Sequence, residues 1–122
     1  MTLEARGTVL FIQLPAPSPS IQAETSGSEQ AFNRPAVVVQ ALDISGSRTV
    51  IVVPGTTRPG AASVQTVVSV KPSSTNGLKE LTHFLPFQIR AIDGARVVRQ
   101  LGKLAPTELR AIDNALRDLL CL

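Results

Sequence analysis

The segment at residues 27–40, GSEQAFNRPAVVVQ, places groups that bind phosphate directly before an apolar run. Pro35 has a fixed φ and no N–H, which suits the first residue of a strand, and it pushes Arg34 into extended geometry. An arginine held in this way, with Glu29 five residues before it, can meet a phosphate with its planar fork. The same spacing also fits a surface arginine that leaves a loop and pairs with Glu29, so the pattern alone leaves both interpretations open.

The runs around this segment predict a mainly β fold. Residues 15–33, rich in proline and serine, separate Arg34 from the first strand and are typical of a functional lid or a mobile loop. A second polar loop, GTTRPG at residues 55–60, is framed by two prolines and two glycines. Continuous apolar runs predict strands that are buried on both faces, as in a small barrel. We expect strands over residues 8–14, 36–42, 49–54, 63–71 and 97–104, a short apolar segment at 81–87, and a turn or a single helical turn at 88–93.

The last element is predicted to be a helix over residues 106–120. Pro106 is at a favoured first helical position, and Glu108 lies in the first turn, where the helix dipole favours a negative charge. Asp113 and Arg117 are expected to form an i,i+4 ion pair on the outer face. Strands followed by one terminal helix predict a small β-barrel with a helix laid on it. The apolar stripe that packs on the barrel comprises Leu109, Ile112, Leu116 and Leu119, with Leu120 beside it.

Length and composition fit one small globular domain. A chain of 122 residues is enough for a single core, so we expect one domain over residues 1–122. No apolar run approaches the ~20 residues that span a bilayer, and the N-terminus lacks the layout of a signal peptide. A cytoplasmic protein is the simplest fit. Arginine is the commoner cation, and the net charge of +3 permits an anionic partner. A charge of this size does not by itself indicate that the partner is a nucleic acid.

Two other residues carry groups that are often reactive. His83 is the only histidine and could shuttle protons near neutral pH, but its place on a short apolar segment some way before Gln88 favours an ordinary surface or core histidine. Cys121 is the only cysteine, which excludes an internal disulfide. It lacks neighbours that would activate a thiol, so we interpret it as a packing residue.

Four motifs in this order resemble the MazF/PemK toxins of bacterial toxin–antitoxin systems. They are GSEQ followed by RPAVVV, the VPGTT loop, the segment QIRAID, and the ending LGKLAPTELRAIDNAL, and the similarity runs from about Arg6 to Leu120. The resemblance implies an SH3-like barrel that forms a homodimer. It also implies an endoribonuclease of the mRNA interferase type, which needs no metal or other cofactor and cuts single-stranded RNA at short sequences. The implied partner is an acidic antitoxin whose extended tail occupies the RNA groove.

The resemblance also implies roles for individual residues. Arg34 matches the family's catalytic arginine, and Thr57, or its neighbour Thr56, matches the catalytic threonine. The general base is the weakest match, because arginine and threonine are poor bases near neutral pH, and Glu29 is the best local candidate. Phe32 either stacks an RNA base or pins its loop to the barrel. The positions that match RNA contacts are Ser28, Glu29, Gln30 and Gln88.

The sequence departs from the family at several positions. Some relatives carry an acid directly before the glutamine of the QIR segment, but Phe87 stands there in this chain. Thr8 replaces the acid that usually follows the first Arg-Gly. These departures keep a second hypothesis open, namely a non-catalytic protein on the same barrel. Such a protein would act like a gyrase poison, or it would only bind RNA or its antitoxin.

Overall fold

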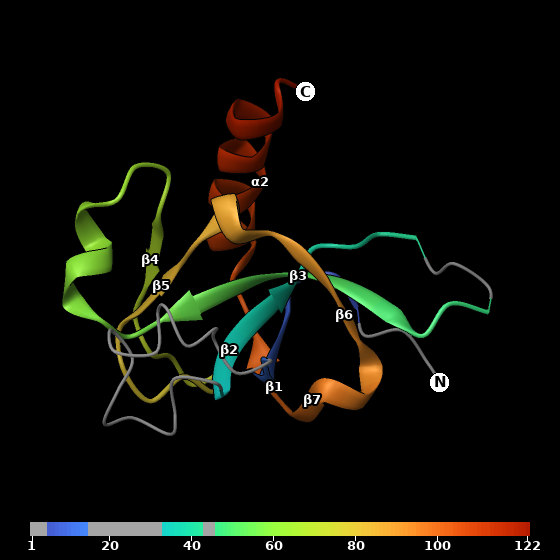
Figure 1. Ribbon diagram of the computed structural model, residues 1–122. Coiled ribbons are helices and arrows are strands. Elements are labelled where there is room, and N and C mark those ends of the chain that lie inside the picture. The colour runs from blue at the N-terminus through green and yellow to red at the C-terminus, as the bar shows by residue number, and fades with distance from the viewer. Residues whose placement is uncertain (1–4, 15–32, 43–45) are drawn as a thin grey trace, which may run out of the picture.

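The computed structural model describes residues 5–14, 33–42 and 46–122. Seven antiparallel strands form a sheet in the order β4-β5-β3-β2-β1-β7, and β6 pairs with β3 beside this path (Figure 1). Among the described strands, β4 and β7 at the two ends of this order are not paired with each other. The elements are β1 (Thr8–Gln13), β2 (Asn33–Val38), β3 (Thr49–Thr56), η2 (Pro59–Ser63), β4 (Val68–Val70), β5 (Thr82–Phe84), η3 (Pro86–Gln88), β6 (Arg90–Asp93), η4 (Gly94–Arg96), β7 (Val97–Lys103) and α2 (Pro106–Leu120).

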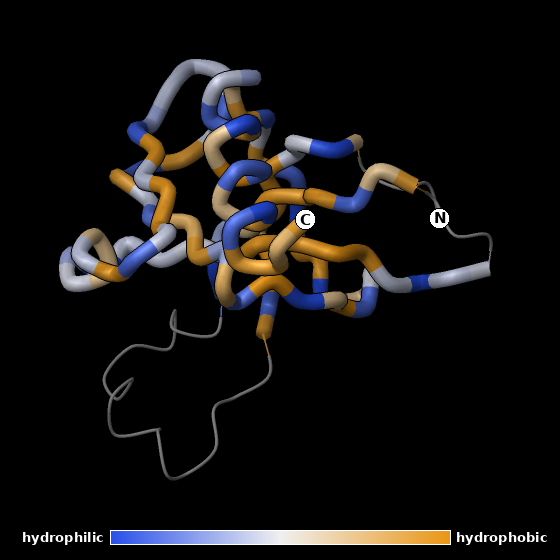
Figure 2. The backbone as a smooth tube through the Cα atoms, turned by 90° about the horizontal axis from the view of Figure 1, so that it is seen from above, coloured by the Kyte–Doolittle hydropathy of each residue, from blue (hydrophilic) through white to orange (hydrophobic). Residues whose placement is uncertain are grey.

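The central strands are buried on both faces, as their apolar runs predict. Alternate residues of a strand point to opposite faces, so each strand contributes to two apolar clusters. Val37 of β2 belongs to the cluster beneath α2, whereas its neighbour Val38 belongs to the cluster on the other side, with Ile92 of β6. Seen from above, α2 lies over the middle of the sheet (Figure 2). The helix packs there through Ile112 and Leu116.

The predicted C-terminal helix is confirmed, with the same bounds. The predicted ion pair between Asp113 and Arg117 on its outer face is wrong. Asp113 pairs with Arg6, from the start of the described chain, and Arg117 donates to Asn114 Oδ1 at 3.1 Å. Asp113 therefore pairs with Arg6, which is distant in the sequence, and not with Arg117 on the same helix. The packing role predicted for Cys121 is also wrong, because this residue is exposed and ends the helix in a left-handed conformation.

Two predicted elements differ from the structure. Of the strand expected over residues 63–71, only Val68–Val70 forms a strand. Thr66 has a φ of +72°, which breaks an extended run, and Pro59–Ser63 forms a short 3-10 helix before it. Conversely, residues 90–93, expected in a turn, form strand β6 because they pair with Thr49–Val52 of β3. The sequence of four residues is too short to signal this tertiary pairing by its own periodicity.

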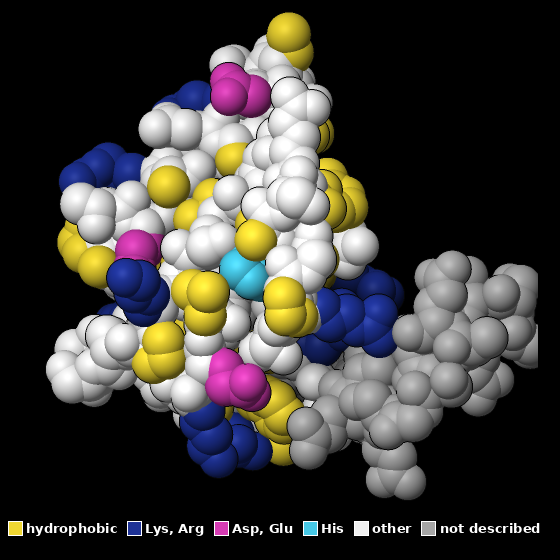
Figure 3. Space-filling model, turned by 90° about the vertical axis from the view of Figure 1, so that its left-hand side faces the viewer, with side chains coloured by type: hydrophobic (Ala, Val, Ile, Leu, Met, Phe, Trp, Pro, Cys, Tyr) yellow, Lys and Arg dark blue, Asp and Glu magenta, His cyan; other side chains and the backbone are white. Residues whose placement is uncertain are grey.

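The surface retains several large hydrophobic side chains. On the face drawn in Figure 3, hydrophobic side chains lie around the chain's one histidine. His83 itself is buried, and its Nδ1 lies 2.7 Å from Ser69 Oγ, so it is a satisfied core histidine. Within the described residues, no helix is both long and apolar enough to cross a membrane. The exposed set comprises Leu42, Ile51, Val64, Leu81, Phe87, Val98, Leu119, Leu120 and Leu122.

Candidate active site

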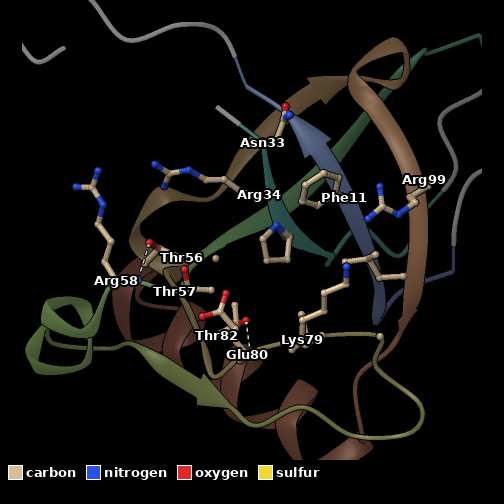
Figure 4. A pocket seen from close by; sticks show the side chains of 15 residues that line it. Phe11, Asn33, Arg34, Thr56, Thr57, Arg58, Lys79, Glu80, Thr82 and Arg99 are labelled. Carbon is tan, nitrogen blue, oxygen red and sulfur yellow. Dashed lines mark hydrogen bonds between the residues drawn. The ribbon is translucent and has the colours of Figure 1, made fainter. Parts of the chain in front are cut away.

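A pocket of about 490 Å³ opens where the start of β2 meets the end of β3 (Figure 4). Residues that are far apart in the sequence line it: the start of β2, the loop after β3, the segment before β5, and facing residues of β1 and β7. The lining is mixed, with cations, hydroxyl groups and apolar side chains together. The lining residues are Phe11, Asn33, Arg34, Pro35, Gly55, Thr56, Thr57, Arg58, Gly77, Leu78, Lys79, Glu80, Thr82, Arg99 and Leu101.

Arg34 enters the pocket from the second position of β2. Pro35 follows it inside the strand, opposite Phe11 of β1. The strand therefore begins at Asn33, two residues before the proline, and not at the proline as the sequence predicts. Burial of the half-buried guanidinium, and then the nearby positive charge of Arg58, lower the pKa of Arg34. Both effects disfavour the charged form, and an anion bound between the two arginines would relieve them. A bound anion would therefore favour the charged form of Arg34.

The threonine loop approaches the pocket from the end of β3. Thr56 is the last residue of the strand, and its Oγ1 accepts a hydrogen bond of 3.3 Å from the backbone N–H of Arg58, which fixes the turn. A Cβ added at Gly55 would lie 2.7 Å from Thr82 Cγ2. Gly55 thus allows β5 to approach β3 closely, and the two strands together form one wall of the pocket.

Sequence reasoning missed the segment that forms the opposite wall. Asn76 is fully buried; its Oδ1 accepts from the N–H groups of Ser73 and Leu78 at 3.1 Å and 3.0 Å, and its Nδ2 donates to the carbonyl of Lys71 at 2.9 Å. Gly77 follows with a φ of +71°. The asparagine holds this turn through these hydrogen bonds, and the turn leads Lys79 and Glu80 to the pocket.

Arg99 forms the far side of the pocket. This side chain of β7 lies with its guanidinium carbon 4.6 Å from the centroid of the Phe11 ring on β1. A cation over an aromatic face is attracted by the ring quadrupole. Arg99 remains exposed to solvent, but it stacks on Phe11 and faces the same pocket as Arg34 (Figure 4).

The candidate residues from the sequence fall into three groups. Arg34, Thr56 and Thr57 line the same pocket. Gln88 ends η3 and is not among the lining residues, and Phe87 beside it is exposed. Among the described residues, no cluster of His, Cys, Asp or Glu is arranged to hold a metal ion. The remaining candidates, Ser28, Glu29, Gln30 and Phe32, lie outside the described residues.

Comparison with known families gives one match over nearly the whole chain. Residues 5–120 match the PemK-like, MazF-like toxins of type II toxin–antitoxin systems. The chain belongs to this family. A search of curated proteins finds no match.

Solved structures have the same fold as this MazF-like chain. MazF from Deinococcus radiodurans is 21% identical, with 100% of each chain covered and a TM-score of 0.71. An endoribonuclease from a mycobacterial species is 20% identical, with 100% of this chain and 95% of that chain covered and a TM-score of 0.70. A mycobacterial endoribonuclease in complex with its cognate antitoxin is 20% identical, with 100% and 97% covered and a TM-score of 0.68. At this identity the likeness concerns the fold.

The MazF-like pocket is strongly cationic. Four basic side chains line it, Arg34, Arg58, Lys79 and Arg99, against one described acid, Glu80. In Figure 4 Arg34 and Arg58 lie on one side, and Lys79 and Arg99 lie on the other. A chain of linked phosphates fits such a pair of positions better than a single anion does, because adjacent phosphates can occupy both.

Arg99 provides a test of this arrangement. We expect Arg99→Met to weaken binding of single-stranded RNA and to reduce the slope of log K against log salt by about 0.7, the value of one lost phosphate contact on a single strand. Fluorescence anisotropy across a salt series measures both quantities. Arg96→Met, in η4 outside the pocket, is the matched control. An unchanged salt slope in Arg99→Met would mean that this arginine only packs on Phe11.

Proposed function

We propose that this chain is the toxin of a type II toxin–antitoxin pair and a metal-independent, sequence-specific endoribonuclease that cleaves single-stranded RNA. The observation that supports the proposal is the shared pocket of Arg34, from β2, and Thr57, from the loop after β3. By the resemblance, these two residues match the family's catalytic pair. Family membership supports the toxin role, and mycobacterial neighbours of the same fold are endoribonucleases. No cofactor is needed for the chemistry below.

The reaction is transesterification within the RNA. The 2′-OH attacks the adjacent phosphorus and expels the 5′-oxygen, which leaves a 2′,3′-cyclic phosphate and a 5′-OH end. Negative charge builds on the non-bridging oxygens, where Arg34 supplies a fixed guanidinium and Thr57 a hydroxyl donor. By analogy with oxyanion-hole donors, each such contact contributes about 3 kcal/mol to transition-state stabilisation. The lowered pKa of Arg34, caused by burial and by Arg58, also makes it a better proton donor to the leaving oxygen.

The remaining sequence candidates complete this proposal. Glu29 is the base expected from the sequence, and Ser28, Gln30 and Phe32 are expected to contact RNA from the segment before Arg34. Gln88 lies outside the pocket, so its contact would be with a nucleotide away from the scissile phosphate.

The cationic pocket also fits an acidic partner. An extended acidic peptide offers carboxylates to the same guanidinium groups that bind phosphate. Neighbours of this fold include an endoribonuclease in complex with its cognate antitoxin and MazE–MazF from Deinococcus radiodurans. We infer that an acidic antitoxin competes with RNA for the pocket formed around Arg34 and Arg99.

We further infer that the sheet closes as an SH3-like barrel and that two chains form a homodimer. The exposed hydrophobic side chains, among them Val98 on β7 and Leu120 on α2, would be covered by a second copy. Sedimentation equilibrium between about 1 and 100 μM is expected to give a dimer mass at the upper end. A monomer mass throughout this range would refute the dimer.

One observation favours a second function. Phe87 stands where some relatives carry an acid, and it is exposed on η3. A protein that binds RNA or antitoxin without cleaving either would need the cationic pocket but no base.

The two functions are separated by incubating pure protein with a long single-stranded RNA and EDTA, followed by mapping of the 5′ ends. We expect discrete cuts at a recurring short sequence, with 5′-OH ends that a kinase labels directly. Intact RNA that is nevertheless bound would support the non-catalytic alternative.

A further inference from the structure

Glu80 occupies a position in the pocket that no sequence argument assigned. It follows Lys79 in the segment before β5, and its backbone carbonyl accepts a hydrogen bond of 3.0 Å from the Thr82 hydroxyl. Figure 4 shows its side chain extending into the pocket toward Thr57, below Arg34. In the proposed function Thr57 and Arg34 hold the scissile phosphate, and Glu80 is the described acid that lines the same pocket.

The other acids in the described part of the chain lie outside the pocket, and three of them have structural roles. Asp93 accepts from the Ala95 N–H at 2.8 Å and begins η4. Glu108 accepts from the Ala105 N–H at 2.9 Å at the start of α2, and Asp113 pairs with Arg6. None of these acids lines the pocket. His83 is buried beside Ser69 and does not line it either.

The segment that carries Glu80 is held in place before any substrate binds. Asn76 fixes the turn with three hydrogen bonds to backbone groups, and Thr75 O accepts a hydrogen bond of 2.8 Å from the N–H of Lys103 on β7. Thr82 then ties the carbonyl of Glu80 to the start of β5. A proton acceptor has to be positioned before the reaction to be effective, and this wall of the pocket provides such a position.

Cations from several elements line the same pocket as this carboxylate. Arg34 comes from β2, Arg58 from the loop after β3, Lys79 from the adjacent position, and Arg99 from β7. These cations draw the RNA backbone into the pocket, whereas a carboxylate repels phosphate. A carboxylate at this position therefore weakens phosphate binding, whereas it can accept a proton in catalysis.

We propose that Glu80 is the catalytic base that takes the proton from the attacking 2′-OH, an inference that rests on the proposed endoribonuclease function. The O2′–H bond breaks as the O2′–P bond forms, and the proton moves to a carboxylate oxygen of Glu80. The P–O5′ bond then breaks, and the 5′-oxygen takes a proton from Arg34. Proton exchange with water returns Glu80 to its ionised form and Arg34 to its protonated form, so no other reactant is consumed.

The test compares Glu80→Gln with the wild type in single-turnover cleavage of an RNA that contains the mapped site, over a range of pH. We expect the rate to fall about 100-fold, in the range usual for a lost general base. The fall in rate toward acid pH, which reports protonation of the base, should disappear in this variant. Glu80→Asp keeps the carboxylate and should retain the acidic limb at a reduced rate. Binding of the same RNA with a 2′-deoxy nucleotide at the cleavage site should be unchanged or tighter.

Two controls make the outcomes separable. Asp118→Asn removes a carboxylate on exposed α2, outside the pocket, and should leave both rate and pH profile unchanged. Glu29→Gln tests the base expected from the sequence. If Glu80→Gln keeps the wild-type rate and acidic limb, or if Glu29→Gln loses the limb instead, Glu80 is not the base. If the wild type cuts no RNA, the proposed function itself fails.

Discussion

Replacing Arg34 with alanine is expected to lower the rate of RNA cleavage about 10³-fold. Arg34 is a half-buried guanidinium in the pocket, and in the proposed function it binds the phosphate on which charge develops. Removal of one such donor typically costs 10²- to 10³-fold in kcat, and the loss of proton donation adds to this. Arg34→Lys keeps the charge but loses the planar fork, and we expect it to remain at least 10²-fold impaired. Single-turnover cleavage of a mapped RNA measures both variants.

The matched control is Arg110→Ala, an exposed arginine on α2 outside the pocket. It changes the net charge by the same amount and should leave the rate unchanged. A cleavage rate in Arg34→Ala within about threefold of the wild type would remove the basis of the proposed mechanism. Retained binding of a 2′-deoxy-substituted RNA would then assign Arg34 to neither chemistry nor affinity.

The sequence predicted the parts of the site that local chemistry determines. Pro35 constrains the residue before it, and this constraint is enough to predict an extended Arg34 at the start of a strand. The helix over residues 106–120 was equally predictable, because its start signals and its apolar stripe agree. The structure of such segments can be predicted from the sequence because their local signals agree with the tertiary structure.

The other half of the pocket could not be predicted, because it depends on long-range contacts. Arg99 and Phe11 are brought together by the pairing of β1 with β7, and no local pattern links them. Glu80 reaches the pocket only because Asn76 and Gly77 fold the preceding turn against β7. Strand β6 is a similar case, because its four residues carry no strand pattern and are extended through their pairing with β3.

Gly77→Ala is expected to destabilise the protein more than any other alanine substitution of a described glycine, by about 4 kcal/mol, near the upper end of measured single substitutions. A Cβ at this position would lie 2.0 Å from the backbone oxygen of Leu101, and the φ of +71° disfavours any side chain. The clash is with backbone of β7, which cannot move aside as a flexible side chain can. Urea unfolding monitored by circular dichroism measures the loss.

Two glycines separate the contact from the backbone conformation. Gly46 has a φ of +82° with nothing within 4 Å of an added Cβ, so Gly46→Ala should cost only the roughly 1 kcal/mol of a left-handed side chain. Gly60, with nothing within 4 Å and no positive φ, should change stability by less than about 0.5 kcal/mol. If Gly77→Ala cost no more than Gly46→Ala, the turn would not be pressed against Leu101. The wall that carries Lys79 and Glu80 would then lack the rigidity that a positioned base requires.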